Sequence, residues 1–435
     1  MAGASETPGL RRALGKWDLT AIGVNQVIGS AIFLLPADVA VRVGTWGPLA
    51  FLAVGLLSLS IALCFAETSS RYDSTGGPIL PARDAFGRFV GFEVGWMLWF
   101  ARVTSHASVV NGLTLALGFY WPALAAGIPR MATIVALTIV LTWINVRGVK
   151  QSSWVVNALT IGKLAPLAIF ILVGIWYIEP SNLTPLPPVT REQVSSALIL
   201  LIFAYGGYEV TGILAGESKD PKKDVPFAFV AAILIVATVM SLTSLVATGV
   251  LSDVGATRTP LADGAALFLG AAGAALISTG SVVSMAGNNM GQLLNGSRTL
   301  FALAENRDLP RWFGYVHPGF RTPSNAILFS AVVAIVLALT GSFVTLAAVS
   351  AIARLVMYVA VCIAVLVLRK RAGPARFTIP FGPVIPILAS VVAFGILAGA
   401  TQAQLIAGAA ALAAGAVLYA LAPKASAGQA GAASS

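Results

Sequence analysis

Charged residues are scarce in this chain. Only 10% of its 435 residues are Asp, Glu, Lys or Arg, whereas 57% are hydrophobic, and the mean hydropathy is +0.88. Soluble domains carry far more charge than this, so the composition excludes a soluble globular protein. Apolar runs long enough to cross a bilayer recur along the chain, and they are continuous rather than alternating. The sequence therefore predicts an all-α polytopic membrane protein.

Cysteine and histidine are also scarce. The two cysteines, Cys64 and Cys362, fall in apolar runs, so we expect buried small side chains and no disulfide framework. Of the two histidines, His106 and His317, the second lies in a predicted loop. This leaves too few groups for the convergent residues of an intramembrane enzyme. We expect no catalytic residues, no metal and no cofactor.

Two further motifs are missing from the sequence. No nucleotide-binding motif is present, which argues against a primary pump. The first residues lack the apolar core of a signal peptide, so we expect the first span itself to direct insertion.

Twelve membrane spans are predicted from the apolar runs. Their approximate ranges are 18–41, 46–68, 89–119, 131–147, 153–178, 193–216, 225–250, 270–303, 324–341, 344–368, 384–400 and 403–421. The small, polar segment 422–435 is expected to be a disordered tail.

Lys and Arg are unevenly placed between these spans. If the N-terminal segment 1–17 is cytoplasmic, the cytoplasmic connections hold most of them, among them Arg298, Arg321 and Arg369-Lys370-Arg371. The outer loops then hold only Arg42, Arg130, Arg191 and Arg258. Because positive charge collects on the cytoplasmic side, we predict that both termini are cytoplasmic and that the number of spans is even. Orientation also accounts for the net charge of +10 without nucleic acid as a partner, although the basic segments could contact anionic membrane lipid.

The first span contains residues that do not suit a continuous membrane helix. Residues 20–36 read TAIGVNQVIGSAIFLLP, with glycines and polar residues clustered between Gly23 and Ser30. Backbone that is not helical survives at membrane depth only where protein or a wet cavity surrounds it. The pattern predicts a break at Gly29-Ser30-Ala31.

The sixth span has the same character. It reads ALILLIFAYGGYEVTGILAGE, and we predict a break at Gly206-Gly207. Two broken helices five spans apart are typical of an inverted five-plus-five repeat, in which the breaks meet and form the solute site. The alternative is that these glycines only allow close helix packing. The predicted division is a first repeat over 18–178, a second over 193–368, and two further helices over 384–421.

At these positions the chain resembles the amino acid–polyamine–organocation superfamily of transporters, and in particular its permeases for basic and neutral amino acids. The first span carries Ile28-Gly29-Ser30-Ala31-Ile32-Phe33 before Pro36, and the sixth carries Phe203-Ala204-Tyr205-Gly206-Gly207-Tyr208-Glu209. Further matches are Gly76-Gly77-Pro78, Glu217-Ser218-Lys219-Asp220-Pro221 and Asn295-Gly296-Ser297-Arg298. The resemblance covers nearly the whole chain and implies a leucine-transporter-like fold. Ala31 departs from it, since the family usually has a second glycine there.

The resemblance implies an α-amino acid or a related amine as the solute. The N–H groups of Ser30 and Ala31 at the start of a half-helix, next to Gly29, suit a carboxylate, and the carbonyl of Val27 suits an ammonium group. The matching positions in the sixth span are Phe203, Ala204, Gly206 and Gly207. Phe203 either covers the solute as a lid or packs as an ordinary core residue.

Other spans must recognise the solute's side chain. The candidates in the third, eighth and tenth spans are Arg102, Ser105, His106, Asn288, Asn289 and Ser350. Arg102 would favour an acidic solute if it faced the site. Alternatively, it forms a structural pair with a carboxylate or with helix-end carbonyls.

Lys163 and Glu209 are the candidate coupling residues. A lysine in the middle of a span is costly as a cation and can give up its proton instead. By resemblance to relatives with a lysine on the fifth span, Lys163 replaces the sodium ion and couples transport to protons. The alternative is a fixed charge that ties the fifth span to the first. Glu209 either takes part in coupling or anchors the break. The hydroxyls of Ser278, Thr279, Ser281 and Ser284 suit sodium, but Lys163 favours sodium independence.

The leading interpretation is a secondary amino acid transporter of the cell membrane that works by alternating access. An amine or polyamine exchanger is a second reading, and it would need acidic residues at the site. The main mid-span carboxylates are Glu93 and Glu209. A membrane solute sensor on a transporter scaffold is a third, which counterflow of labelled amino acids in liposomes would distinguish.

Overall fold

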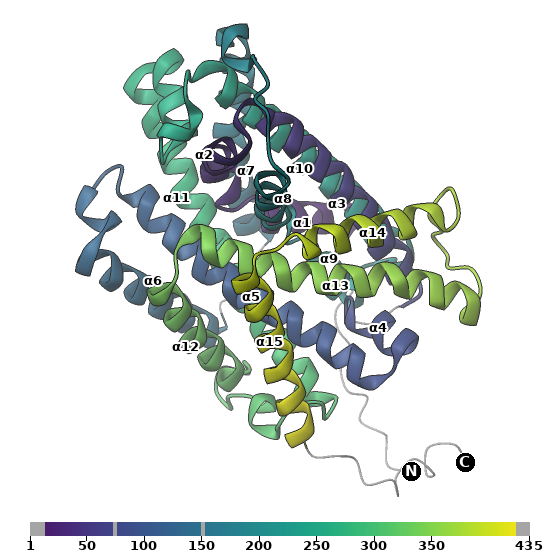
Figure 1. The fold of residues 1–435 in the computed structure, drawn as a ribbon. Coiled ribbons are helices and arrows are strands. Elements are labelled where there is room, and N and C mark those ends of the chain that lie inside the picture. Colours follow the sequence, from purple (N-terminus) through teal and green to yellow (C-terminus); the bar gives the residue numbers. More distant parts are fainter. Residues whose placement is uncertain (1–13, 73–75, 149–152, 423–435) are drawn as a thin grey trace, which may run out of the picture.

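The computed structural model describes residues 14–72, 76–148 and 153–422. Regular structure in this part consists of helices and one isolated bridge between Leu14 and Ser218 (Figure 1). Helices satisfy their own backbone N–H and C=O groups, which a bilayer requires. Most of the predicted N-terminal segment, residues 1–13, and the predicted disordered tail from residue 423 lie outside the described residues.

Each predicted span coincides with a helix or a pair of helices in the described part of the chain. The first span is α1 (Lys16–Val27) with α2 (Ala31–Val43), and the sixth is α8 (Arg191–Tyr205) with α9 (Val210–Ile213). The others are α3 (Gly47–Ser69), α5 (Arg88–Leu117), α6 (Gly127–Arg147), α7 (Ser153–Gly174), α10 (Pro221–Val250), α11 (Pro260–Glu305), α12 (Ser324–Thr340), α13 (Phe343–Ala372), α14 (Val384–Ala398) and α15 (Gln402–Leu421).

Two helical segments differ from the prediction. A short helix, α4 (Ile79–Phe86), lies in the connection between the second and third spans. The helix of the eighth predicted span, α11, begins at Pro260 rather than at residue 270, because two helices join across Gly270. That residue has φ 64° and ψ −160°, a conformation that suits glycine. Short 3₁₀ turns complete the connections: η1 (Gly44–Trp46), η2 (Pro122–Ala125), η3 (Ile175–Tyr177), η4 (Pro180–Leu183), η5 (Ala215–Glu217), η6 (Val254–Ala256) and η7 (Arg311–Gly314).

Eight helical stretches in the described residues are long and apolar enough to cross a membrane, and Ser324–Thr340 and Val384–Ala398 are shorter apolar helices. Their outward side chains are large and hydrophobic, for example Leu172, Val332 and Phe394. Such a surface suits lipid rather than water. The protein is therefore a multi-pass membrane protein, while twelve crossings and the inverted repeat stay predictions.

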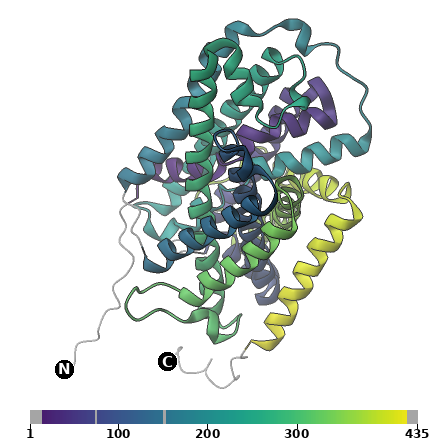
Figure 2. The same ribbon diagram turned by 90° about the vertical axis from the view of Figure 1, so that its left-hand side faces the viewer.

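The two broken helices occupy the middle of the bundle. The labels of α1, α8 and α9 lie between α3 and α10 on one side and α5 and α13 on the other (Figure 1). In the most apolar part of the Arg191–Ile213 stretch, 83% of the residues are buried inside the protein. The corresponding share for Gln402–Leu421 is 17%. The last helix, α15, lies along the edge of the molecule (Figure 2, yellow). The breaks are thus enclosed by protein, as backbone that is not helical requires at this depth.

Candidate solute-binding site

Both predicted breaks are present in the structure. The first helix ends at Val27 and the next begins at Ala31, so that Ile28, Gly29 and Ser30 form the interruption. This is one residue earlier than predicted, because Ala31 is already helical. The sixth span is interrupted between Tyr205 and Val210.

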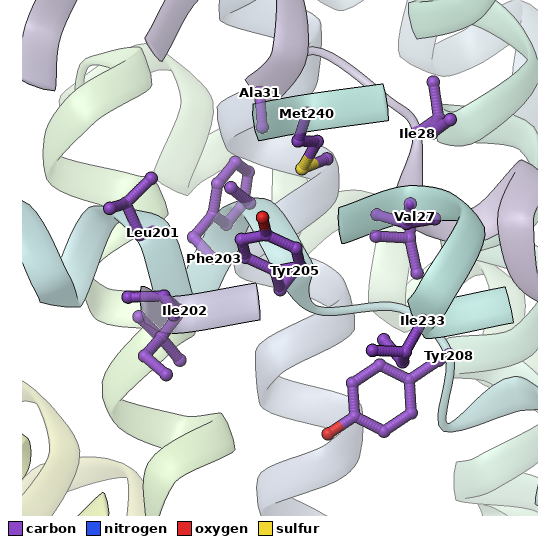
Figure 3. Packing of buried hydrophobic residues seen from close by; sticks show 14 of the residues in the cluster. Val27, Ile28, Ala31, Leu201, Ile202, Phe203, Tyr205, Tyr208, Ile233 and Met240 are labelled. Carbon is purple, nitrogen blue, oxygen red and sulfur yellow. The ribbon is translucent and has the colours of Figure 1, made fainter. Parts of the chain in front are cut away.

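The two breaks touch each other through Gly207. This residue has φ 131°, and a Cβ atom on it would lie 2.5 Å from the carbonyl oxygen of Gln26 and 3.1 Å from the nitrogen of Val27. Only glycine fits both the backbone angle and the close approach. Apolar side chains from both broken helices, among them Val27, Ala31 and Phe203, belong to one buried cluster (Figure 3).

A small polar cavity lies between the breaks. Its lining residues are Gln26, Val27, Gly29, Ser30, Ala31, Ser105, Val109, Phe203, Gly206, Asn288, Gln292 and Arg354. The volume of the cavity is about 10 Å³, which is room for roughly one water molecule. In this conformation the site is therefore too narrow for an amino acid.

Six of the eight predicted substrate-binding residues line this cavity. They are Val27, Gly29, Ser30, Ala31, Phe203 and Gly206. The other two, Ala204 and Gly207, do not line it among the described residues. Gly207 packs against the backbone of α1 instead, and Ala204 is buried on α8.

Unpaired donors mark one end of the first break. Ser30 is 1% exposed, and its hydroxyl has no hydrogen-bond partner in the part of the chain that the structure describes. The N–H groups of Ser30 and Ala31 likewise donate to no described residue. They stand at the positive end of α2, a 13-residue helix. This arrangement can hold a carboxylate.

Carbonyl oxygens mark the other end of the break. The oxygen of Gln26 accepts a hydrogen bond of 2.7 Å from the amide of Asn288. The oxygen of Val27 accepts none from the residues described here. In the second break, the oxygen of Phe203 accepts from the N–H of Gly206, whereas the carbonyl of Gly206 is free of described donors. Free carbonyls on both breaks can receive an ammonium group.

Lys163 contacts the first break from α7. Its Nζ donates to the carbonyl oxygens of Asn25 at 3.0 Å and Ile28 at 2.9 Å, and the residue is fully buried. The hydroxyl of Ser284 on α11 also reaches this break, at 3.2 Å from the oxygen of Ile28 and 3.1 Å from that of Gly29. The carbonyls freed by the first break are therefore shared between an ammonium group and a hydroxyl.

The other predicted hydroxyls of the eighth span do not reach the break. Ser281 donates to the carbonyl of Ser278, and Thr279 donates to that of Ala275 within the same helix. No cluster of His, Cys, Asp and Glu in the described residues could hold a metal ion.

Arg102 adopts the second of its two predicted roles, a structural pair. Its Nη2 lies 3.4 Å from Oε2 of Glu209, and it also donates to the carbonyl of Gly207. Its Nη1 donates to the amide oxygen of Gln292 at 3.2 Å. Gln292 in turn bonds Asn288, so that a chain of polar groups runs from Arg102 to the first break.

Glu209 lies at the centre of a buried polar cluster. Besides Arg102, its carboxylate accepts from Nε of Arg354 at 3.3 Å, from the hydroxyl of Tyr358 at 2.5 Å and from the N–H of Gly207 at 2.9 Å. The glutamate thus stabilises the unwound turn from within, as the anchoring alternative requires.

Arg354 is a site residue that sequence reasoning missed. It extends from α13, and its Nη1 and Nη2 donate to the hydroxyls of Ser350 at 2.6 Å and Ser105 at 3.1 Å. A Cβ atom on Gly206 would lie 2.3 Å from its Nε. The signal was available, because a cation inside a span is costly and marks a functional position. What singled out Arg102 in the sequence holds for Arg354 as well.

The remaining side-chain candidates divide into two groups. Ser105 and Asn288 line the cavity, and Ser350 supports Arg354 from behind. The ring of His106 instead contacts the carbonyl of Asn289 at 3.3 Å and the hydroxyl of Thr138 at 3.4 Å, away from the cavity. Gln26, Val109 and Gln292 also line the cavity but were not predicted.

A larger cavity of about 820 Å³ lies beside the small one. Its walls include Asn25 and Gln26 at the first break, and Arg298 and Arg321 at the side predicted to be cytoplasmic. Gln26 lines both cavities, and its Nε2 would lie 2.0 Å from a Cβ on Gly291 of α11. Among the described walls, Gln26 is the one residue that belongs to both the small cavity and this larger one, the vestibule.

Comparison with known proteins agrees with this geometry. The chain is 31% identical to the serine/threonine exchanger SteT of Bacillus subtilis, over 90% of this chain and 92% of that protein. It is 30% identical to the methylthioribose transporter of the same organism, with 90% and 88% covered, and 30% identical to its branched-chain amino acid permease BcaP, with 89% and 88% covered.

The profile that describes the amino acid permease family matches residues 14–421. This range contains both breaks, the cavity between them and every helix described above. The chain therefore belongs to the amino acid permease family, whose members are membrane transporters and not enzymes.

Proposed function

We propose that this protein carries an amino acid across the cell membrane by alternating access, with the solute held between the two helix breaks. The observation that carries the proposal is the small cavity between the breaks, where N–H groups and a carbonyl without partners among the described residues occupy opposite ends of one break. An α-amino acid needs both kinds of partner, since it bears a carboxylate and an ammonium group on one carbon. Membership of the permease family agrees with it.

In this scheme the backbone binds the part that all amino acids share. The N–H groups of Ser30 and Ala31, together with the hydroxyl of Ser30, hold the carboxylate at the positive end of α2. The carbonyls of Val27 and Gly206 accept from the ammonium. Phe203 covers the solute and is supported by Phe343, whose ring centre lies 6.1 Å away. Gly207 keeps the two backbones close, and Gly29 leaves room for the side chain of Asn288, which lies 2.9 Å from the place of a Cβ atom. Ala204 is buried beside Phe203 on α8.

Transport by this scheme is independent of sodium. The ammonium of Lys163 already occupies the carbonyls of Asn25 and Ile28. A sodium ion at the first break would need the same oxygens. Proton coupling through Lys163, with Glu209 as a second participant, remains part of the proposal. Replacing sodium with choline in an uptake assay is expected to leave the rate unchanged.

The proposed orientation has both termini in the cytoplasm. Leu14, which precedes α1, pairs with Glu217 and Lys219, which follow α9, at 3.0 and 2.9 Å. The start of α1 and the end of α9 therefore lie on the same side of the molecule. This is expected for two broken helices that run in opposite directions. The vestibule opens on this same side, and the occluded site would release its solute there once Gln26 moves.

An amine or polyamine exchanger fits the site less well. No Asp or Glu lines the cavity among the described residues. Glu209 is neutralised by two arginines, and Glu93 lies beside Gly415 of α15, away from the breaks. A polyamine would meet cations at this site rather than carboxylates.

Transport can be tested with the purified protein in liposomes. Counterflow of labelled amino acids is expected in the wild type, together with a rise in thermal stability when a transported amino acid is present. Stabilisation without counterflow would favour the sensor alternative. If no amino acid either binds or moves, the proposed function is wrong.

A further inference from the structure

The buried cluster next to the cavity carries unbalanced positive charge. Arg102 and Arg354 share a single carboxylate, that of Glu209, and all three side chains are at most 2% exposed. The other partners of the two guanidinium groups are neutral: hydroxyls, an amide and a carbonyl. An excess charge at membrane depth is costly unless something compensates it.

The excess charge is presented to the solute by Arg354. Of the two arginines, only Arg354 is among the described lining residues. Arg102 lies behind the second break, where it bonds Gly207 and Gln292. The cavity wall, as far as the described residues form it, therefore carries a cation and no carboxylate.

The guanidinium of Arg354 is held in position but is not saturated. Its Nε donates to Glu209, and one N–H each of Nη1 and Nη2 is used by Ser350 and Ser105. A guanidinium has five N–H donors, so two are without an acceptor in the described part of the chain. Ser105 and Ser350 also bond each other at 2.8 Å, and Ser350 is fixed to the carbonyl of Ala101. An arginine fixed in this way is prepared to bind a carboxylate through two N–H groups.

Glu209 does not depend on Arg354 alone. It keeps Arg102, the hydroxyl of Tyr358 and the N–H of Gly207 as partners. Arg354 can therefore turn some of its donors toward a ligand without leaving the glutamate unpaired.

We propose that Arg354 binds a carboxylate on the side chain of the solute, so that the preferred substrates are acidic amino acids. This inference rests on the proposed function, in which the first break holds the α-carboxylate and ammonium groups. A second carboxylate on the solute neutralises the excess charge of the cluster. A neutral amino acid leaves it uncompensated, and a basic amino acid adds to it.

The test compares four labelled amino acids in liposomes that contain the full-length protein. L-glutamate and L-aspartate are expected to be taken up at least about tenfold faster, at equal low concentration, than L-glutamine and L-leucine. They should also raise the melting temperature more. Uptake of neutral amino acids with no preference for the acidic ones would overturn this inference and leave the proposed function intact. Absence of uptake of all four would also overturn this inference, whereas the proposed function fails only if no amino acid of any kind binds or moves.

Variants locate the effect at Arg354. Arg354→Gln is expected to reduce glutamate uptake by about tenfold or more while changing glutamine uptake by less than about threefold. Arg354→Lys keeps the charge but not the paired N–H donors. Its glutamate uptake should therefore lie between that of the wild type and that of Arg354→Gln. Equal loss of glutamate and glutamine uptake in both variants would instead mean that Arg354 only supports the fold. Arg147→Gln, at the end of α6 against Trp143, is the matched control and should keep the wild-type preference.

Discussion

The Nζ atom of Lys163 lies 2.9 Å from the carbonyl oxygen of Ile28, inside the break between α1 and α2. The lysine comes from α7, and its second contact, with the oxygen of Asn25, is on the last turn of α1. One ammonium group thus bridges the end of a half-helix and the unwound residues that follow it. Any change of its charge would alter the geometry of the break directly.

Replacing Lys163 with methionine is expected to slow amino acid uptake by about tenfold or more, because the buried carbonyl of Asn25 loses its ammonium donor and that of Ile28 keeps only Ser284. If Lys163 exchanges its proton during transport, the variant should also lose the dependence of the rate on pH. Uptake measured on the acid and alkaline sides of neutrality tests this. A slower rate with the wild-type pH profile would leave Lys163 as a fixed structural charge.

Ser284→Ala is the matched control for Lys163. It removes the other donor to the oxygen of Ile28 without removing an ionisable group. We expect a moderate loss of rate with the pH profile unchanged. A flat profile in this variant too would mean that any disturbance of the break abolishes the pH dependence, so the lysine would have no special role.

Gly207→Ala tests the contact between the two breaks. The added methyl group would lie 2.5 Å from the carbonyl oxygen of Gln26, at a residue with φ 131°. We expect destabilisation of about 1–3 kcal/mol and loss of uptake, measured by thermal unfolding and by counterflow. Gly162→Ala on α7 is the control, since its methyl group would lie 3.7 Å from Val283, an ordinary contact distance. Equal effects of the two substitutions would contradict the proposed contact.

The breaks could be predicted because their signals are local. Glycines and polar residues interrupt two apolar runs, and each break lies at such a cluster. The role of Arg354 could not be predicted in the same way. Its partners Ser105, on α5, and Glu209, in the second break, are far away in the sequence, and which face of α13 turns inward depends on packing. The early start of α11 was missed because one residue, Gly270, joins two helices that the hydropathy pattern separates.

Glu209→Gln tests the balance of charge in the buried cluster. The substitution leaves Arg102 and Arg354 without their shared carboxylate, and breaking a buried ion pair from one side costs about 3–5 kcal/mol. We expect a large fall in melting temperature. The double variant Glu209→Gln with Arg354→Met should recover part of it, because one of the two unpaired charges is removed as well. A double variant that is no more stable than Glu209→Gln alone would mean that Arg354 is not coupled to Glu209.

Gln26 lines both the small cavity and the vestibule, so we expect that shortening it opens a path between them. Val109 lines only the small cavity among the described walls, and Val109→Cys places a thiol there with little change of volume. With Gln26 present, a small thiol reagent added from the vestibule side should react slowly. With Gln26→Ala added, we expect labelling to be faster by about tenfold or more, because a gap the size of the lost side chain admits the reagent. The native Cys64 and Cys362 are both fully buried and should give a low background in the parent chain. Equal rates with and without the Gln26 side chain would show that another residue closes the site.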